Sequence, residues 1–389
     1  MRPRLLAMVI VIVVVAGTFR ANLSTVRAGE QSTASGYKVL DPIRHGSLTV
    51  FPAVAAKSYP TAEFLTLDEG LRSGEVVVTE YGNIRGLLRR HTPATQHDVA
   101  EVNRLVLVNN SKHPLLLLAG EIVAGGKQDR VIGKDRIVAP ESDPVDLSVF
   151  CVEPGRWVAT SDHFGASGTI YPTASAGRIG SVGGNGDTVH GTLMAQPSVR
   201  AKAMADKDQN QVWAEVREQQ QSMAVEVANA SPSSSAPGEI RSTSSYARVM
   251  ESKEVKEKVD EVAKPIEQNY QSLIKQLRDR KAVGVVVAVN GRIIWSDIFA
   301  STELLEKYWP KLVRSYASEA VVTRAKGGEA SLALAEAFLK EMEGRKETIE
   351  SEPGIYRHTE VNGDGFKAFA LTSLLPETGF EVHVAKMAE

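Results

Sequence analysis

The chain has 389 residues, and its 45 Lys and Arg against 47 Asp and Glu give a net charge of −2. Hydrophobic residues make up 43% and charged residues 24%, a balance typical of globular proteins, which excludes mainly disordered, collagenous and multi-span membrane chains. The near-zero net charge provides no overall attraction to polyanions, so we expect no nucleic-acid partner.

The N-terminus has the pattern of a signal peptide. Residues 5–17 are a continuous apolar run that follows Arg2 and Arg4. At about 1.5 Å per residue the run gives roughly 20 Å of helix, which is short for a hydrocarbon core of about 30 Å. We expect residues 1–28 to be removed after Ala28, with cleavage after Gly17 or an uncleaved anchor as the alternatives. The remaining chain would be exported, periplasmic or extracellular, and without a membrane span.

Residues 29–163 are predicted to be rich in strands. Short apolar segments follow one another without long helices between them, which indicates an antiparallel or mixed sheet in a β-sandwich or a partly open barrel. One short helix is predicted at 63–75, stopped by Gly74. The predicted strands are residues 46–55, 75–82, 104–111, 114–123, 130–139 and 145–153.

The middle of the chain changes character twice. Residues 164–196 contain many glycines and little apolar matter, which predicts a long mobile loop. Residues 197–280 have helical periodicity and are predicted to form a helical insertion. A Ser/Pro-rich segment at 231–238 is predicted to be a flexible joint within it. In the second half of the insertion, Pro265 is expected to kink or break the helix.

Residues 281–389 are predicted to complete the domain. Asn290-Gly291 between two apolar runs is typical of a type I′ hairpin turn. Ser301 is a suitable cap for a following helix, in which Pro310 is expected near the start, and a second helix is expected from about Glu329. The last three apolar segments predict an antiparallel meander. The fold class expected for the whole chain is therefore α+β.

Cysteine and histidine give little indication of metal or redox chemistry. Cys151 is the only cysteine and lies in an apolar segment, so we expect a buried thiol. The alternative is a nucleophilic thiol paired with His163. The eight histidines are scattered without an H-x-x-x-H pair, so no metal site and no cofactor are predicted.

The segment 119–130, AGEIVAGGKQDR, contains the strongest candidate for a binding turn. It fails as a phosphate loop, because Glu121 replaces the first glycine and Gln128 replaces the final Ser or Thr. Two interpretations remain. The turn is either a bend with solvated basic side chains, or an anion-binding turn that uses Lys127, Gln128 and Arg130.

Two further segments supply candidate ligand contacts. The segment 151–157, CVEPGRW, places Arg156 beside Trp157, a pair that can stack on or bind an anion. The alternative is a capped strand end with a covered aromatic ring. The segment 309–316, WPKLVRSY, adds Lys311 and Arg314 on a predicted helix. Because neighbouring strands end close together, we expect residues 125–130 and 153–157 to meet as one electropositive rim.

These three segments, in this order, resemble the ARG and rhodanese-phosphatase-superfamily-associated protein domain family, in which ARG stands for ADP-ribosylglycohydrolase. The resemblance covers about residues 46–323. It implies a context near ADP-ribose or phosphate chemistry but no settled activity.

We therefore predict an exported, noncatalytic domain that binds a small anionic ligand or an envelope protein. One alternative is a hydrolase or transferase acting on a phosphate-bearing or ADP-ribose-like molecule, with Glu121 or Glu153 as the base. A second alternative is a structural envelope protein.

Overall fold

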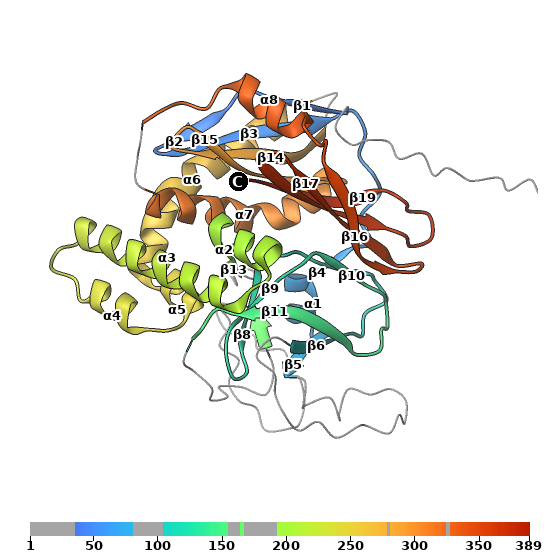
Figure 1. Cartoon of the computed structure of the whole chain (residues 1–389), viewed down its shortest axis with the longest axis horizontal. Coiled ribbons are helices and arrows are strands. Elements are labelled where there is room, and N and C mark those ends of the chain that lie inside the picture. The colour runs from blue at the N-terminus through green and yellow to red at the C-terminus, as the bar shows by residue number, and fades with distance from the viewer. Residues whose placement is uncertain (1–35, 81–103, 155–163, 167–192, 278–280, 324–326) are drawn as a thin grey trace, which may run out of the picture. The chain divides into compact units, whose positions relative to one another are not determined.

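The computed structural model describes residues 36–80, 104–154, 164–166, 193–277, 281–323 and 327–389 (Figure 1). The predicted signal peptide, most of the predicted Gly-rich loop, His163, Arg156 and Trp157 lie outside these residues. The fold is α+β, as the sequence predicts. Residues 34–389 form one compact unit.

The largest sheet has nine strands, and every pairing in it is antiparallel. Its order is β1-β3-β14-β15-β19-β18-β17-β16, with β2 also pairing with β3. The sheet therefore joins the first strands of the described chain to the last four. The strands are β1 (Tyr37–Val39), β2 (Ile43–His45), β3 (Leu48–Ala55), β14 (Lys281–Val289), β15 (Arg292–Phe299), β16 (Arg345–Glu352), β17 (Tyr356–Gly363), β18 (Phe366–Ser373) and β19 (Glu381–Ala388).

The hairpin and the closing meander of this sheet were both predicted correctly. Asn290 and Gly291 have φ of 51° and 81°, the positive values that a type I′ turn between β14 and β15 requires. Strands β17, β18 and β19 form the expected meander. The edge strand β16 was not predicted, because its sequence RKETIESE is charged and five of its eight residues are exposed.

A second sheet closes on itself. Six strands are hydrogen-bonded in the order β12-β5-β6-β11-β9-β8, and β8 pairs again with β12, while β13 extends the sheet from β8. The strands are β5 (Val76–Glu80), β6 (Arg104–Asn109), β8 (Glu121–Gly125), β9 (Arg130–Ile132), β11 (Val145–Cys151), β12 (Phe164–Ala166) and β13 (Leu193–Met194). The predicted loop at 164–196 thus contributes β12 and β13 within the described residues.

A third sheet has three short strands, which are interleaved in sequence with the strands of the closed sheet. It has the order β10-β7-β4, in which β4 (Leu65–Thr66) is parallel to β7 (Leu115–Leu117) and β10 (Arg136–Val138) is antiparallel to it. Its strands and those of the closed sheet share one apolar cluster, which includes Leu107, Leu117 and Val149. Burial of these side chains holds the two sheets together.

The first helix is short, and it begins and ends at residues whose side chains or backbone favour a helix end. Thr66 and Glu69 form a capping box at the start of α1 (Leu67–Ser73), and Gly74 ends it with φ of 75°. The other helical segments are α2 (Pro197–Ala201), the π-helical turn η3 (Lys202–Asp206), α3 (Gln209–Ala230), α4 (Ala236–Ser242), α5 (Tyr246–Glu251), α6 (Lys253–Gln276), α7 (Thr302–Val322) and α8 (Leu332–Lys340).

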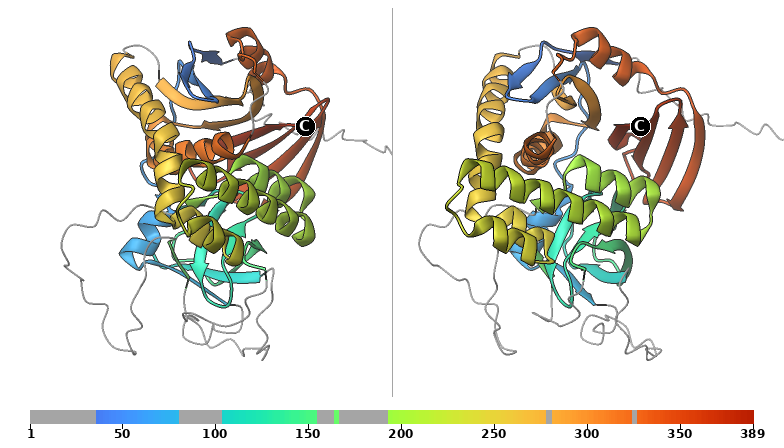
Figure 2. Two further views of the ribbon diagram at one scale, coloured as in Figure 1. Left: turned by 90° about the vertical axis from the view of Figure 1, so that its left-hand side faces the viewer. Right: turned by 60° about the vertical axis from the view of Figure 1, so that its left-hand side comes forward.

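The helices between 197 and 276 are built into the core of the protein. Helix α6 packs against α7 and against β2 (Figure 2). Its buried residues, among them Val259, Ile266 and Tyr270, belong to the same apolar cluster as residues of β3 and β14. The segment at 231–238 includes a turn closed by Ser234 N–H and Ser231 O at 3.0 Å, and its Ala236 is buried in α4.

The prolines do not interrupt the helices where the sequence suggested. Helix α6 is not broken at Pro265, and the break in this region comes at Ser252, between α5 and α6. Pro310 lies in the interior of α7, which begins at Thr302, although Ser301 caps that helix as predicted, with its Oγ accepting from Leu304 N–H. Within the described residues, no helix is both long and apolar enough to cross a membrane.

Candidate functional site

A group of charged side chains is buried where the nine-stranded sheet, α2 and the β9–β10 segment meet. Asp297 of β15 lies at its centre, with no exposed surface. The Arg200 guanidinium donates two hydrogen bonds of 2.9 Å to it, one to each carboxylate oxygen. The Tyr316 hydroxyl also donates to Asp297, and His383 Nε2 lies 3.1 Å from its Oδ1. Asp297 therefore accepts hydrogen bonds from three different elements of the fold.

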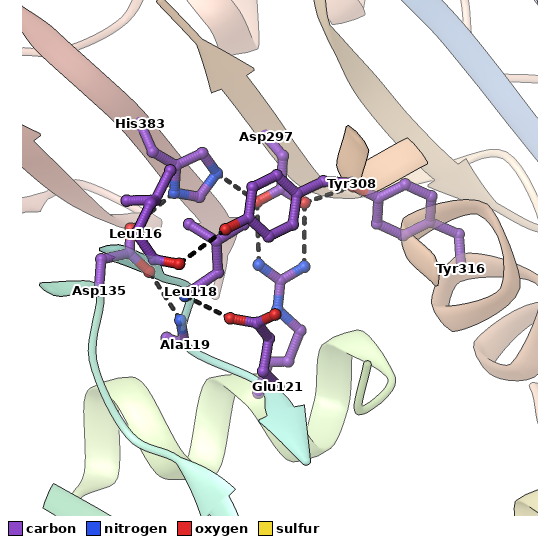
Figure 3. A network of polar contacts seen from close by, with 10 residues as sticks. Leu116, Leu118, Ala119, Glu121, Asp135, Asp297, Tyr308, Tyr316 and His383 are labelled. Carbon is purple, nitrogen blue, oxygen red and sulfur yellow. Dashed lines mark hydrogen bonds and ion pairs between the residues drawn. The ribbon is translucent and has the colours of Figure 1, made fainter. Parts of the chain in front are cut away.

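His383 connects this aspartate to a second one. Its Nδ1 lies 2.6 Å from Asp135 Oδ2, so the imidazole bridges two carboxylates (Figure 3). Burial alone would lower the pKa of His383, but the charges and hydrogen bonds of Asp135 and Asp297 outweigh it and raise the pKa to about 9. The ring is consequently an imidazolium at neutral pH, and both of its nitrogens donate.

The pKa values of the two aspartates move the other way. Burial raises them, but His383 lowers the pKa of Asp135, and Arg200 with His383 lowers that of Asp297. Asp135 Oδ1 also accepts from Ala119 N–H at 2.7 Å. Arg200 and His383 carry two positive charges and the aspartates two negative ones. We call Asp135, Arg200, Asp297 and His383, with Tyr316, the buried charge network.

The backbone explains how these side chains meet. Asp297 pairs with Ala385 and Phe299 with His383 in the β15–β19 ladder, so Asp297 and His383 are diagonal neighbours on one face of the sheet. Arg200 reaches them by crossing Gly120, which has φ of 96°. A Cβ at Gly120 would lie 2.5 Å from Arg200 Cγ, so only glycine fits there.

Two residues proposed from the sequence, Glu121 and Lys311, form a separate buried ion pair. Glu121 is fully buried, its Oε2 accepts from Leu118 N–H at 2.7 Å, and its Oε1 pairs with Lys311 Nζ. Lys311 also lies 2.9 Å from Asp68 Oδ2 and 4.5 Å from the centroid of the Tyr308 ring. Burial raises the pKa of Glu121, although Lys311 opposes this effect. The pair connects the GEIVAGG strand to α7.

The turn at 125–130 contacts Glu153 just after β11, which is the described part of the contact expected between 125–130 and 153–157. Gln128 Nε2 donates to Glu153 O, and Asp129 N–H donates to Glu153 Oε2, both at 3.1 Å. Arg130 pairs with Cys151 in the β9–β11 ladder. Gln128, Arg130 and Glu153 are all buried.

The charge at this junction is mixed. Within the described residues, Lys127 and Arg130 are accompanied by the carboxylates of Glu80, Asp129 and Glu153. Lys127 N–H donates to Glu80 Oε1 at 2.8 Å. The other half of the predicted rim, Arg156 and Trp157, lies outside the described residues.

The remaining candidates lie apart from this junction. Arg314 forms an ion pair with Asp260 of α6 and is partly exposed. Cys151 is buried, and burial raises the pKa of its thiol, which makes it a poor nucleophile. Within the described part of the chain, no cluster of three His, Cys, Asp or Glu residues could hold a metal ion.

Sequence reasoning did not identify the buried charge network. Its members come from five segments that are distant in sequence, and no spacing rule connects them. A weak signal was present, because Asp297 and His383 are ionisable residues within mostly apolar strands, at positions whose neighbours are buried.

A surface groove lies between α6 and α7, with a volume of about 250 Å³. Tyr270, Leu305 and Trp309 are buried and form its floor, and the Tyr270 and Trp309 rings stack with centroids 4.2 Å apart. The Tyr270 hydroxyl and the Trp309 indole N–H have no hydrogen-bond partner in the described part of the protein. The exposed residues around the groove are Gln271, Lys275, Glu306 and Pro310.

Residues in the three segments singled out from the sequence make buried contacts. Segment 119–130 provides Gly120 and Glu121, and residues 151–153 meet the turn at 128–130. Helix α7 provides Trp309, Lys311 and Tyr316. Comparison with curated proteins and with solved structures found no match. A family model does match, over residues 36–386. The chain thus belongs to the family of the ARG and Rhodanese-Phosphatase-superfamily-associated Protein domain.

Proposed function

We propose that this protein is an exported, noncatalytic domain that binds a small anionic molecule in the α6–α7 groove. The groove itself is the observation that carries the proposal, because it combines an aromatic floor with polar side chains at its edge. Ligand sites commonly have this composition. At about 250 Å³ the groove is smaller than the roughly 300–1,000 Å³ of drug-sized sites, so it suits a single ring or a short acyl chain.

The floor of the groove has unused hydrogen-bonding capacity. The Tyr270 hydroxyl and Trp309 N–H are buried donors without a described partner. A buried donor left unpaired costs about 1–3 kcal/mol. An acceptor atom on the ligand, reached by a small movement of either ring, would offset that cost. Lys275 supplies a cation for an anionic head group at one part of the edge, and Glu306 places a carboxylate at another.

The positions of the two carboxylates considered as catalytic bases favour a noncatalytic role. Glu121 is fully buried and paired with Lys311, and Glu153 is buried against Asp129 N–H. A general base must reach a substrate proton within hydrogen-bond distance. In the described structure both carboxylates are instead engaged by the protein itself.

The binding test uses three ring-sized probes that differ in charge: benzoate, benzamide and benzylamine. Saturation-transfer NMR should detect benzoate binding to the full protein, with weaker signals from the other two probes. Ile274→Trp, which fills the groove, should abolish the signal, and Lys275→Gln should weaken it at least threefold. Ser272→Trp is the matched control, because Ser272 is an exposed residue of the same helix outside the groove lining.

Two results would overturn the binding proposal. One is equal binding of all three probes, and the other is benzoate binding that survives Ile274→Trp. Export is tested separately with a reporter fused after Ala28, which should be found outside the cytoplasm. Retention of the reporter in the cytoplasm would contradict export and leave the groove untouched.

A further inference from the structure

The inner face of β17 packs against charged residues from two other parts of the fold. Tyr356, His358 and Glu360 alternate along the strand and are all buried. Because alternate residues of a strand share a face, these three side chains point the same way. The segments opposite them are 134–136, which leads into β10, and Lys207, which follows η3.

Ion pairs hold this contact together. Lys134 pairs with Glu350 of β16, Arg136 NH2 lies 3.3 Å from Glu352 Oε2, and Lys207 Nζ lies 3.0 Å from Glu360 Oε2. We call this contact the meander junction. It consists of His358, Glu350, Glu352 and Glu360 on the meander side, and Lys134, Arg136 and Lys207 on the opposite side.

His358 is the exception within the junction, because it has no polar partner. Its relative exposure is 1%, and neither ring nitrogen has a hydrogen-bond partner in the described residues. The ring stacks on Phe369 of β18, with centroids 6.0 Å apart. A ring buried without a hydrogen bond at either nitrogen is more easily kept neutral than charged.

The charges around His358 oppose one another. Lys134 and Lys207 disfavour a positive ring, while Asp135 and Glu360 favour one, and Glu350 stands opposite His358 in the β16–β17 ladder. Burial is the largest effect and, with the two lysines, lowers the pKa of His358 to about 4. The carboxylates are already engaged, Asp135 with His383, Glu350 with Lys134 and Glu360 with Lys207.

We propose that the meander junction is an acid-sensitive contact: protonation of His358 creates a buried cation without an acceptor beside two lysines, and β16–β17 separates from segment 134–136 and from Lys207. The nine-stranded sheet retains its other strands, because β14, β15 and β19 are paired independently of β16. The opening is thus a local change at one edge of the sheet.

The size of the effect follows from proton linkage. A ring with a pKa of about 4 in the closed junction and 6.5 in water takes up its proton mainly in the open state. The folded-state pKa is the lower of the two, so the closed state is favoured above pH 6.5 and loses this advantage as the pH falls toward 4. His358 by itself should raise the open population about fiftyfold between about pH 7 and pH 4.5. Glu350 opposes this rise, because burial and Glu352 raise its pKa in the closed junction.

Hydrogen exchange on the full chain tests this prediction. Protection factors of β16 and β17 amides should fall steeply from about pH 7 to pH 4.5 in the wild type, while those of β14 and β15 stay high. His358→Phe, which keeps a stacking ring but cannot titrate, should largely remove the pH dependence. His113→Gln is the control, because His113 is half-exposed and paired with Glu63 at 2.9 Å.

A second variant and a direct titration cover the possibility that His358→Phe does not fold. His358→Gln should remove the same pH dependence, and NMR of the His358 ring should show a pKa near 4. The proposal is overturned if the non-titrating variants keep the wild-type acid response. It is also overturned if β14 and β15 lose protection together with β17, or if His358 titrates near 6.5.

Discussion

Asp297 and His383 stand two ladder positions apart on adjacent antiparallel strands, and their side chains meet 3.1 Å apart in the interior of the protein. Because His383 also contacts Asp135, this pair connects the nine-stranded sheet to the segment between β9 and β10. Buried ion pairs contribute little net stability against apolar replacements, but removing one partner leaves an uncompensated charge and is costly.

Replacing Asp297 with asparagine should therefore be strongly destabilising. Asp297→Asn keeps the shape of the side chain but leaves Arg200 and His383 without their shared counter-ion. We expect the free energy of unfolding in urea to fall by about 3–5 kcal/mol.

The control for this variant is Asp146→Asn. Asp146 pairs with Arg104, but its side chain is 52% exposed, so the loss should be within about 1 kcal/mol. A small loss in both variants would mean that the buried charge network contributes little to stability.

Stability should also fall at alkaline pH because of His383. Its pKa is raised from 6.5 to about 9, so the folded state holds this proton more tightly than the unfolded state. The resulting stabilisation is complete below pH 6.5 and is lost as the pH rises through 9. A shift of this size corresponds to about 3 kcal/mol.

Urea unfolding measured at intervals between about pH 6 and pH 10 would show this loss. His383→Gln should have a lower but flatter profile over the same range, because the titrating group is gone. If the wild type and His383→Gln lose stability in parallel between pH 7 and pH 9, another group is responsible.

The sequence was sufficient to predict the parts of the fold that depend on local patterns. The Asn290-Gly291 hairpin, the Ser301 cap and the C-terminal meander follow from turn chemistry and from alternation of apolar residues, which act over a few residues. The contact of Gln128 with Glu153 was also within reach, because strand ends that follow apolar runs meet at sheet edges.

Contacts between distant segments could not be predicted in this way. Lys311 was proposed to contact an anionic ligand, and Glu121 was a candidate base in the enzyme alternative. In the structure Lys311 pairs with Glu121 and Asp68, which depends on how α7 packs across β8. Arg200 lies in a short helix whose sequence has no motif, and its role depends on a bidentate contact with Asp297, 97 residues away.

Gly120→Ala should be destabilising because of backbone strain and because of a clash with Arg200. Gly354→Ala serves as the control that separates the two effects. Gly120 has φ of 96°, which disfavours any side chain, and the new Cβ would lie 2.5 Å from Arg200 Cγ. Gly354 also has positive φ, 76°, but a Cβ added there would meet no neighbouring atom within 4 Å. Gly354→Ala therefore measures the backbone strain alone, at about 1–2 kcal/mol.

Gly120→Ala should cost at least about 1 kcal/mol more than Gly354→Ala, because the buried guanidinium must shift away from Asp297. Thermal unfolding of both variants beside the wild type gives the comparison. Equal losses would show that Arg200 can move without breaking its contact with the carboxylate.

The last prediction concerns the coupling between Glu121 and Lys311. Lys311→Met leaves the buried Glu121 carboxylate facing an apolar side chain, and the expected loss of unfolding free energy is about 3–5 kcal/mol. Glu121→Gln should cost less, because Lys311 keeps Asp68 at 2.9 Å and the amide oxygen can still accept from Leu118 N–H. In the double variant no unpaired charge remains at Glu121, so its loss should be smaller than the sum of the two single losses by about 1–3 kcal/mol.

The same double-mutant cycle on Lys253 and Glu257, an exposed pair one helical turn apart in α6, should give a coupling of only about 0.3–0.5 kcal/mol. Additive losses at Glu121 and Lys311 would mean that the two side chains do not depend on each other in solution.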